Sequence, residues 1–161
     1  MTNSIVIMIT WLLVIGVGVM AGVYFTFSTF IMRALDALPA KHAIEVMNSI
    51  NQVIVKSLFL PLFLGTTFLA LLQVALSLTY LQGTPSYLGV ISGLIYVLTM
   101  FFITALFNVP LNNQLAGFDP QKDKAESTWA SYRFRWIRWN HARTIGSLIS
   151  VVLSLSILTL I

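Results

Sequence analysis

The chain has 161 residues, of which 58% are hydrophobic and only 9% are charged. Soluble domains carry about 25% charged residues, so a chain of this composition cannot cover its surface for water. The sequence contains no cysteine, which excludes disulfides, iron–sulfur clusters and thiol catalysis. Two histidines and five acidic residues are a poor supply for a metal site, and we expect neither a metal nor another cofactor.

Four apolar stretches follow one another along the chain, at about residues 5–32, 58–81, 87–109 and 139–161. Each is close to the ~20 residues that a helix needs to cross a bilayer. The alternating segments of a membrane β-barrel are absent, and helices satisfy their backbone polar groups internally. The N-terminus lacks the basic region of a signal peptide, so we expect the first stretch to be retained. The sequence predicts an all-α bundle of four transmembrane helices, with residues 1–161 as one domain.

The charged residues predict the topology of this bundle. All nine Lys and Arg and all five Asp and Glu lie in two segments, 33–56 and 119–143, whereas the QGTPS hairpin and both termini carry no charged side chain. With four crossings, both charged segments lie on the same side, which the positive-inside rule makes the cytoplasm. The basic balance is therefore a topology signal, and we expect no nucleic acid partner.

The two charged segments are also expected to be helical. Residues 39–56 are amphipathic, with one apolar face formed by Ala43, Ile44, Met47, Ile50 and Ile54. Asp119 and Pro120 form a suitable N-cap and first turn for a helix that continues into the fourth stretch. We therefore predict that helices two and four are extended on the cytoplasmic side, with a kink at Pro61.

Several polar residues at membrane depth are predicted to face the bundle interior, because exposure to lipid is costly. A helical wheel places Arg143 and Asn140 on the inward face of helix four, whereas Arg135 and Arg138 point to the lipid headgroups. Asn108 lies inward on helix three. The predicted polar floor of the bundle, near the cytoplasmic boundary, comprises Asn51, Asn108, Asn112, Asn140 and Arg143.

Above this floor we expect an aromatic-lined cleft, the usual form of a small-molecule site. Its candidate ligand-binding residues are Trp129, Tyr132 and Trp136 on helix four, and Thr26 and Thr29 on helix one. Simpler interpretations stay open, because interfacial tryptophans often form a membrane belt and helical threonines bond their own backbone. Gly18 and Gly22 form a small-xxx-small pair, which predicts close helix packing.

The histidines differ in position. His141 is the only neutral base near the polar floor, although it lies about 100° around the helix from Asn140. His42 lies toward the polar face of residues 39–56, where we expect it to be solvated.

The motif order GVMAGVYFTFSTFIMRAL, VMNSIN, LFNVPLNNQLAGFDP and WASYRFRWIRWNHARTIGSLIS resembles the bacterial members of the anthrone oxygenase-like family of small four-helix membrane proteins. The resemblance covers nearly the whole chain, and its most specific parts are NVPLN and the run Trp136 to Thr144. It implies a bacterial inner-membrane protein, and the topology predicted from the charges places both termini in the periplasm. Fungal members of that family convert anthrones to anthraquinones. The motif positions fall here on Asn51, Asn108, Pro110, Leu111, Asn112, Trp136, Trp139, Asn140, Arg143 and Thr144.

The resemblance and the polar floor together suggest a cofactor-independent oxygenase of an anthrone-like ketone or polycyclic phenol. Deprotonation would give an enolate that reacts directly with dioxygen. Arg143, Asn140 and Asn108 would stabilise this anion, and His141 would accept the proton. The expected partners are a hydrophobic small molecule, dioxygen and the lipid bilayer, with homo-oligomerisation left open.

Two other functions remain open at the level of sequence. Four-helix bundles with core histidines hold haem, and a quinone would fit the same kind of cleft. The chain supplies only His42 and His141 as haem ligands. The third reading is a non-catalytic transporter or scaffold subunit, which would require oligomerisation.

Overall fold

The computed structural model describes residues 2–119 and 123–161, and in this part of the chain all regular structure is helical. Its elements in chain order are α1 (Thr2–Thr26), η1 (Phe27–Ile31), α2 (Met32–Asp36), α3 (Ala40–Ile54), α4 (Phe59–Tyr80), α5 (Thr84–Tyr96), η2 (Val97–Phe102), η3 (Thr104–Asn108), α6 (Val109–Ala116) and α7 (Ala125–Leu158). The three η elements are π-helical turns within longer helices.

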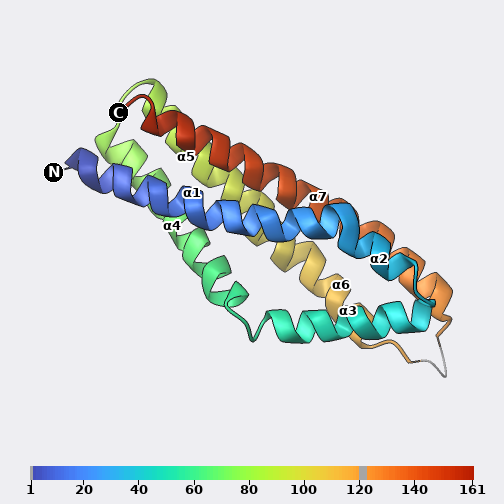
Figure 1. Ribbon diagram of the computed structural model, residues 1–161. Helices are drawn as coiled ribbons and strands as arrows, with labels where there is room; N and C mark the ends of the chain where they lie inside the picture. Colours follow the sequence, from blue (N-terminus) through green and yellow to red (C-terminus); the bar gives the residue numbers. More distant parts are fainter. Residues whose placement is uncertain (1, 120–122) are drawn as a thin grey trace.

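Four helical spans are long and apolar enough to cross a membrane, namely Ser4–Asp36, Phe59–Tyr80, Thr84–Ala116 and Ala125–Leu158. The predicted all-α bundle of four membrane helices is therefore confirmed. Figure 1 shows both termini and the α4–α5 turn at one end of the bundle. The opposite end, formed by α2, α3, α6 and the first turns of α7, carries most of the charged residues and is called the charged end below.

The second spanning helix is short, with 22 residues against 33 or 34 in the other three spans. Its expected extension is a separate helix, α3, because the chain turns at residues 55–58. There the Ser57 hydroxyl accepts a hydrogen bond of 3.1 Å from the Phe59 N–H at the start of α4. Pro61 lies in the first turn of α4, where no intrahelical donor is needed. The break therefore precedes the proline, and α3 packs its apolar face on α6 and α7 (Figure 1).

The fourth helix begins later than expected. α7 starts at Ala125 and runs for 34 residues to Leu158. Asp119 does not cap it. The Asp119 N–H instead donates to Asp123 Oδ2 at 2.9 Å, and the Asp123 N–H donates to the Asp119 carbonyl at 2.8 Å. Pro120, the expected first-turn residue, lies outside the described residues.

Glycines allow close approach of the helices, but these are not Gly18 and Gly22, the pair expected from the sequence. Gly18 and Gly22 lie on the exposed face of α1, where an added Cβ would meet no atom within 4 Å. The prediction that they pack helices closely is wrong, because the inward face of α1 is set by its buried apolar side chains. The close approaches use other glycines: a Cβ added at Gly93 of α5 would lie 2.5 Å from the Ala70 carbonyl of α4, and one added at Gly146 of α7 would overlap Thr99.

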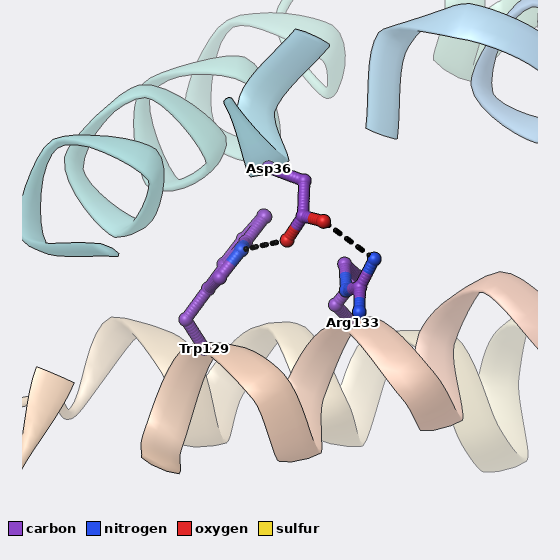
Figure 2. Close-up of polar contacts among 3 residues, drawn as sticks. All are labelled: Asp36, Trp129 and Arg133. Atoms are coloured by element: carbon purple, nitrogen blue, oxygen red, sulfur yellow. Dashed lines mark hydrogen bonds and ion pairs between the residues drawn. The ribbon is translucent and has the colours of Figure 1, made fainter. Parts of the chain in front are cut away.

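At the charged end, one carboxylate joins the first helix to the last. Asp36 ends α2, and its two oxygens accept from Trp129 Nε1 at 3.1 Å and from Arg133 Nη1 at 2.7 Å (Figure 2). Both members of the ion pair are about 40% exposed, with side-chain values of 42% and 38%, so solvent screens the pair. We therefore expect this contact to orient α2 relative to α7 and to add little to the free energy of unfolding.

The glycine contacts generate a stability test. Gly93→Ala is expected to lower the free energy of unfolding by about 1–3 kcal/mol, because the new methyl group would overlap a backbone carbonyl. The matched control, Gly18→Ala, is expected to be neutral or to stabilise by up to about 1 kcal/mol through higher helix propensity. Thermal unfolding in detergent compares the two variants. Equal effects would contradict the assigned α4–α5 contact.

Candidate functional site

The centre of the candidate site is the guanidinium of Arg143, which is 95% buried within the bundle, since only 5% of the residue is exposed. Its Nη2 donates to Asn140 Oδ1 at 2.8 Å, and its Nη1 donates to Thr104 Oγ1 at 3.2 Å. The guanidinium carbon lies 4.4 Å from the centre of the Tyr24 ring and 5.3 Å from that of Trp136. Aromatic faces therefore supply much of its surroundings, a favourable environment for a cation.

Arg143 has no carboxylate partner within the described part of the chain. Arg133 pairs with Asp36, but both lie at the charged end and are partly exposed. The Nε of Arg143 is also buried without a hydrogen-bond partner there. A buried unpaired cation costs several kcal/mol, so a side chain placed in this way marks a functional-site candidate with an affinity for anions.

Asn140 holds this guanidinium in place through a π-helical turn of the first span. Its Nδ2 lies 2.8 Å from the Tyr24 carbonyl and 2.8 Å from Ser28 Oγ, and donates to both. Ser28 also bonds the Thr144 hydroxyl at 3.0 Å. Tyr24 lies in the last turn of α1, whereas Ser28 belongs to the π-turn η1 that follows it. Asn140 thus ties Arg143 to the first helix.

Asn108 occupies a second π-helical turn, η3, just before Pro110. Proline has no N–H, so the regular backbone pairing is interrupted at this point. Asn108 is 1% exposed, and its Nδ2 donates to the Trp136 carbonyl at 3.3 Å. Its Oδ1 is buried with no partner among the described residues. Asn108 therefore offers an unused acceptor, as Arg143 offers an unused Nε donor.

A cleft of about 170 Å³ lies beside these groups. Its lining residues come from the end of α3 and the turn after it, the start of α4, the third span and α7, and Figure 1 shows that α4 diverges from α1 and α7 toward the charged end. Its polar lining consists of Asn51, Thr104, Asn108, Asn112 and Arg143. Its apolar lining consists of Ile54, Val55, Phe59, Leu60, Phe63 and Val109. The Nδ2 of Asn51 is a further buried donor without a partner in the described chain.

The structure thus gathers the predicted polar residues around one space. Asn51, Asn108, Asn112 and Arg143 line the cleft, and Asn140 supports Arg143 from behind. Asn112 has a further role, since its Oδ1 accepts from Tyr132 Oη at 2.9 Å and from Trp136 Nε1 at 2.8 Å.

The other predicted ligand-binding residues do not line this cleft. Trp129, Tyr132 and Trp136 belong to a packed core cluster with Phe27, and Trp129 is bound to Asp36 as described above. Thr26 and Thr29 donate to carbonyls of their own helix, those of Val23 and Phe25, each at 2.7 Å. The aromatic wall of the cleft comes from α4, through Phe59 and Phe63.

The expected proton acceptor is also displaced from the site. His141 is exposed on the outer face of α7, because it is one residue, and therefore about 100°, from Asn140. No histidine, aspartate or glutamate lines the cleft. His42 is exposed on α3, as expected, and the described residues contain no group of three side chains suited to hold a metal ion.

Sequence reasoning missed Tyr24, Ser28, Phe59 and Phe63. Tyr24 and Ser28 share the inward face of the first span, and that shared spacing was an available signal. The role of the two phenylalanines follows from the turn at residues 55–58, which displaces α4 and leaves their rings beside open space.

Comparison with known proteins gives one match. The family model described as anthrone oxygenase matches residues 51–153, well over half of the chain. This range includes Asn51, Asn108, Asn140 and Arg143, but it leaves out the first helix with Tyr24. No curated protein and no solved structure matches the chain.

The environment of Arg143 predicts an unusual stability effect. Arg143→Met keeps an unbranched but shorter side chain and removes the cost of burying the charge, and we expect this gain to outweigh the lost hydrogen bonds. We expect the free energy of unfolding in detergent to stay within about 1 kcal/mol of the starting protein or to rise. Asn140→Leu is the comparison, and we expect it to be destabilised by about 1–3 kcal/mol because it strands the Tyr24 carbonyl and the guanidinium. A larger loss in Arg143→Met than in Asn140→Leu would contradict the unpaired state of the cation.

Proposed function

Because this chain belongs to the anthrone oxygenase family, we propose that it oxidises an anthrone-like ketone or polycyclic phenol with dioxygen, without a cofactor, in the cleft beside Arg143. An oxygenase-type activity follows from the family. The substrate, the mechanism and the residues are our proposal.

The observation that carries the proposal is the buried guanidinium, with no counter-ion among the described residues, at the wall of a largely apolar cleft. A ketone with an acidic methylene group becomes a flat, delocalised enolate when it loses a proton. Such an anion would supply the missing negative charge while its rings contact Phe59 and Phe63. A preorganised donor in a dry site stabilises developing charge by about 3–4 kcal/mol.

The donors and the acceptor of the cleft fit an oxygen substituent in either state. Arg143 and Asn51 can donate to an enolate oxygen, whereas the unused Oδ1 of Asn108 can accept from the neutral phenol form. The site therefore holds the substrate before and after deprotonation, with the charged form favoured by Arg143.

The reaction balances with dioxygen alone. The methylene group loses one proton, and the enolate passes one electron to dioxygen to give superoxide and a carbon radical. Their combination forms a C–O bond, and proton uptake gives a hydroperoxide. Loss of the second C–H proton with cleavage of the O–O bond releases water and leaves a carbonyl. In total, the CH₂ group and O₂ become C=O and H₂O, so carbon is oxidised by four electrons and dioxygen is reduced by four.

The first proton needs an acceptor, and the lining of the cleft supplies none. We therefore assign this role to water that enters the cleft, whose lining residues Val55 and Leu60 are partly exposed. The chain then contributes anion stabilisation and orientation, and the acidity of the substrate contributes the rest.

The size of the cleft limits how much of the substrate is enclosed. Its volume of about 170 Å³ is near the ~150 Å³ of a cavity that holds benzene and below the ~300 Å³ of a small ligand pocket. We propose that one ring, with its oxygen, lies at Arg143. The other rings of a polycyclic substrate would extend past Leu60 and Val55, which line the cleft and are partly exposed.

The placement of charge supports an orientation in the membrane. The end with both termini carries no charged side chain, whereas the charged end has most of the nine Lys and Arg. We propose that the charged end faces the cytoplasm of a bacterial inner membrane, with both termini in the periplasm. A haem protein is less well supported, because His42 and His141 are both exposed.

The proposal is tested by turnover of anthrone in detergent, followed by the absorbance of anthraquinone and by oxygen uptake. Arg143→Met is expected to lower kcat about 10²–10³-fold, because the enolate loses its main donor. Arg33→Gln, at an exposed arginine outside the cleft, is the control and should retain full turnover. Wild-type turnover in Arg143→Met, with the protein folded, would refute the mechanism.

A variant of the acceptor gives independent information. Asn108→Leu keeps the approximate volume of the side chain but removes the Oδ1 that faces the substrate. We expect KM to rise by about tenfold, with a smaller change in kcat, because this group binds the neutral substrate more than the anion. A fall in kcat alone would instead place Asn108 among the groups that stabilise the anion.

A further inference from the structure

A long groove runs along the outside of the bundle between the third span and α7, and it is separate from the cleft at Arg143. The part nearer the charged end, of about 310 Å³, is lined mainly by α7 residues from Ser127 to Arg135 and by Gln114. The part farther from the charged end, of about 450 Å³, is lined by Phe107, Arg135, Arg138, Trp139 and Ala142. Arg135 lines both parts, so the two hollows adjoin at this side chain.

The spacing of residues along α7 explains why the groove is continuous. Thr128, Ser131, Arg135, Arg138 and Ala142 are three or four residues apart, so they share one face of the helix. On the third span, Phe107, Leu111 and Gln114 follow the same spacing and form the opposite wall.

The chemistry changes in order along this groove. Hydroxyl groups of Ser127, Thr128 and Ser131 line the part farthest toward the charged end. The two arginines follow. An apolar wall comes last, where the rings of Phe107 and Trp139 stack with centres 3.8 Å apart and planes 12° apart. This order, from hydroxyl to cation to hydrocarbon contact, matches the order of parts in a phospholipid.

The arginines are available to bind an anion. Arg135 and Arg138 are both exposed, and neither forms an ion pair within the described chain. Arg138 lies 5.2 Å above the Phe134 ring, a contact that leaves its N–H donors free to bind oxygen. Since no carboxylate lines either part of the groove, a bound phosphate would meet two cations and no repulsion.

We propose that this groove binds one anionic glycerophospholipid with a hydroxylated headgroup, such as phosphatidylglycerol. Its phosphate lies between Arg135 and Arg138, its headgroup hydroxyls reach Thr128 and Ser131, and one acyl chain lies along Phe107 and Trp139. Basic pockets between membrane helices recognise anionic lipids through the same combination of forces. The site does not depend on the proposed oxidation.

Native mass spectrometry of the delipidated full chain tests the site, with equal amounts of phosphatidylglycerol and phosphatidylcholine that carry identical acyl chains. The starting protein is expected to prefer phosphatidylglycerol by roughly tenfold or more, given two arginines at the headgroup. The double variant Arg135→Gln and Arg138→Gln should reduce this preference to about twofold or less. The matched control Arg33→Gln removes an exposed arginine that lines a different groove, and it should keep the full preference.

Two further measurements separate the lipid from its parts. Inorganic phosphate at the same molar amount should not raise the unfolding temperature, whereas phosphatidylglycerol should. Trp139→Ala should weaken retention of both lipids, because the acyl wall is lost. Equal binding of the two lipids by the starting protein, an unchanged preference in the double variant, stabilisation by phosphate alone, or undiminished retention in Trp139→Ala would each overturn the proposal.

Discussion

The burial of one positive charge without a negative partner is the constraint around which this bundle is organised. Arg143 could be neutralised by a carboxylate on any facing helix, yet the described spans place none beside it. The chain instead surrounds the cation with neutral groups: the amide of Asn140, the hydroxyl of Thr104 and the faces of Tyr24 and Trp136. These groups lower the cost of burial without cancelling the charge, so the field of the guanidinium remains available to a guest in the cleft.

Irregular backbone makes this arrangement possible. Asn140 donates to the Tyr24 carbonyl in the last turn of α1, close to the point where the first π-turn begins. The π-turn at Phe27–Ile31 carries Ser28, whose hydroxyl accepts from Asn140, and the π-turn at Thr104–Asn108 brings two polar side chains toward α7. Pro110 lies two residues after the end of the second turn, which gives the NVPLN motif a structural meaning. Both asparagines of this motif line the cleft, and Asn112 also accepts hydrogen bonds that fix two aromatic side chains of α7.

Composition and helical periodicity predicted the spanning helices and the side chains that face inward, whereas the tertiary contacts of the helix ends could not be predicted from them. The count of charges and the length of the apolar stretches predicted four spanning helices, and the 100° wheel placed Arg143 and Asn140 inward. The same wheel placed His141 about 100° away from Asn140, and in the structure His141 is exposed outside the site. Tertiary features had no periodic signal. The turn between α3 and α4 depends on Ser57 and on the packing of α3, and it decides that Phe59 and Phe63, rather than the α7 tryptophans, form the wall of the cleft. For Gly18 and Gly22 the spacing predicted a helix contact that the structure lacks, because both glycines face outward and no other helix of the described chain lies against them.

Among the described residues, the cleft is lined by a cation and amides but by no carboxylate or imidazole, and under the proposed oxidation this has a consequence for which molecules would react. An enzyme with a strong internal base can activate many carbonyl compounds, and it must then discriminate among them by shape. Here only compounds that surrender a proton readily to water would become reactive, whatever else enters from the bilayer. Chemical acidity would thus act as the filter, and ordinary lipids, which have no such proton, could occupy the same opening without being oxidised.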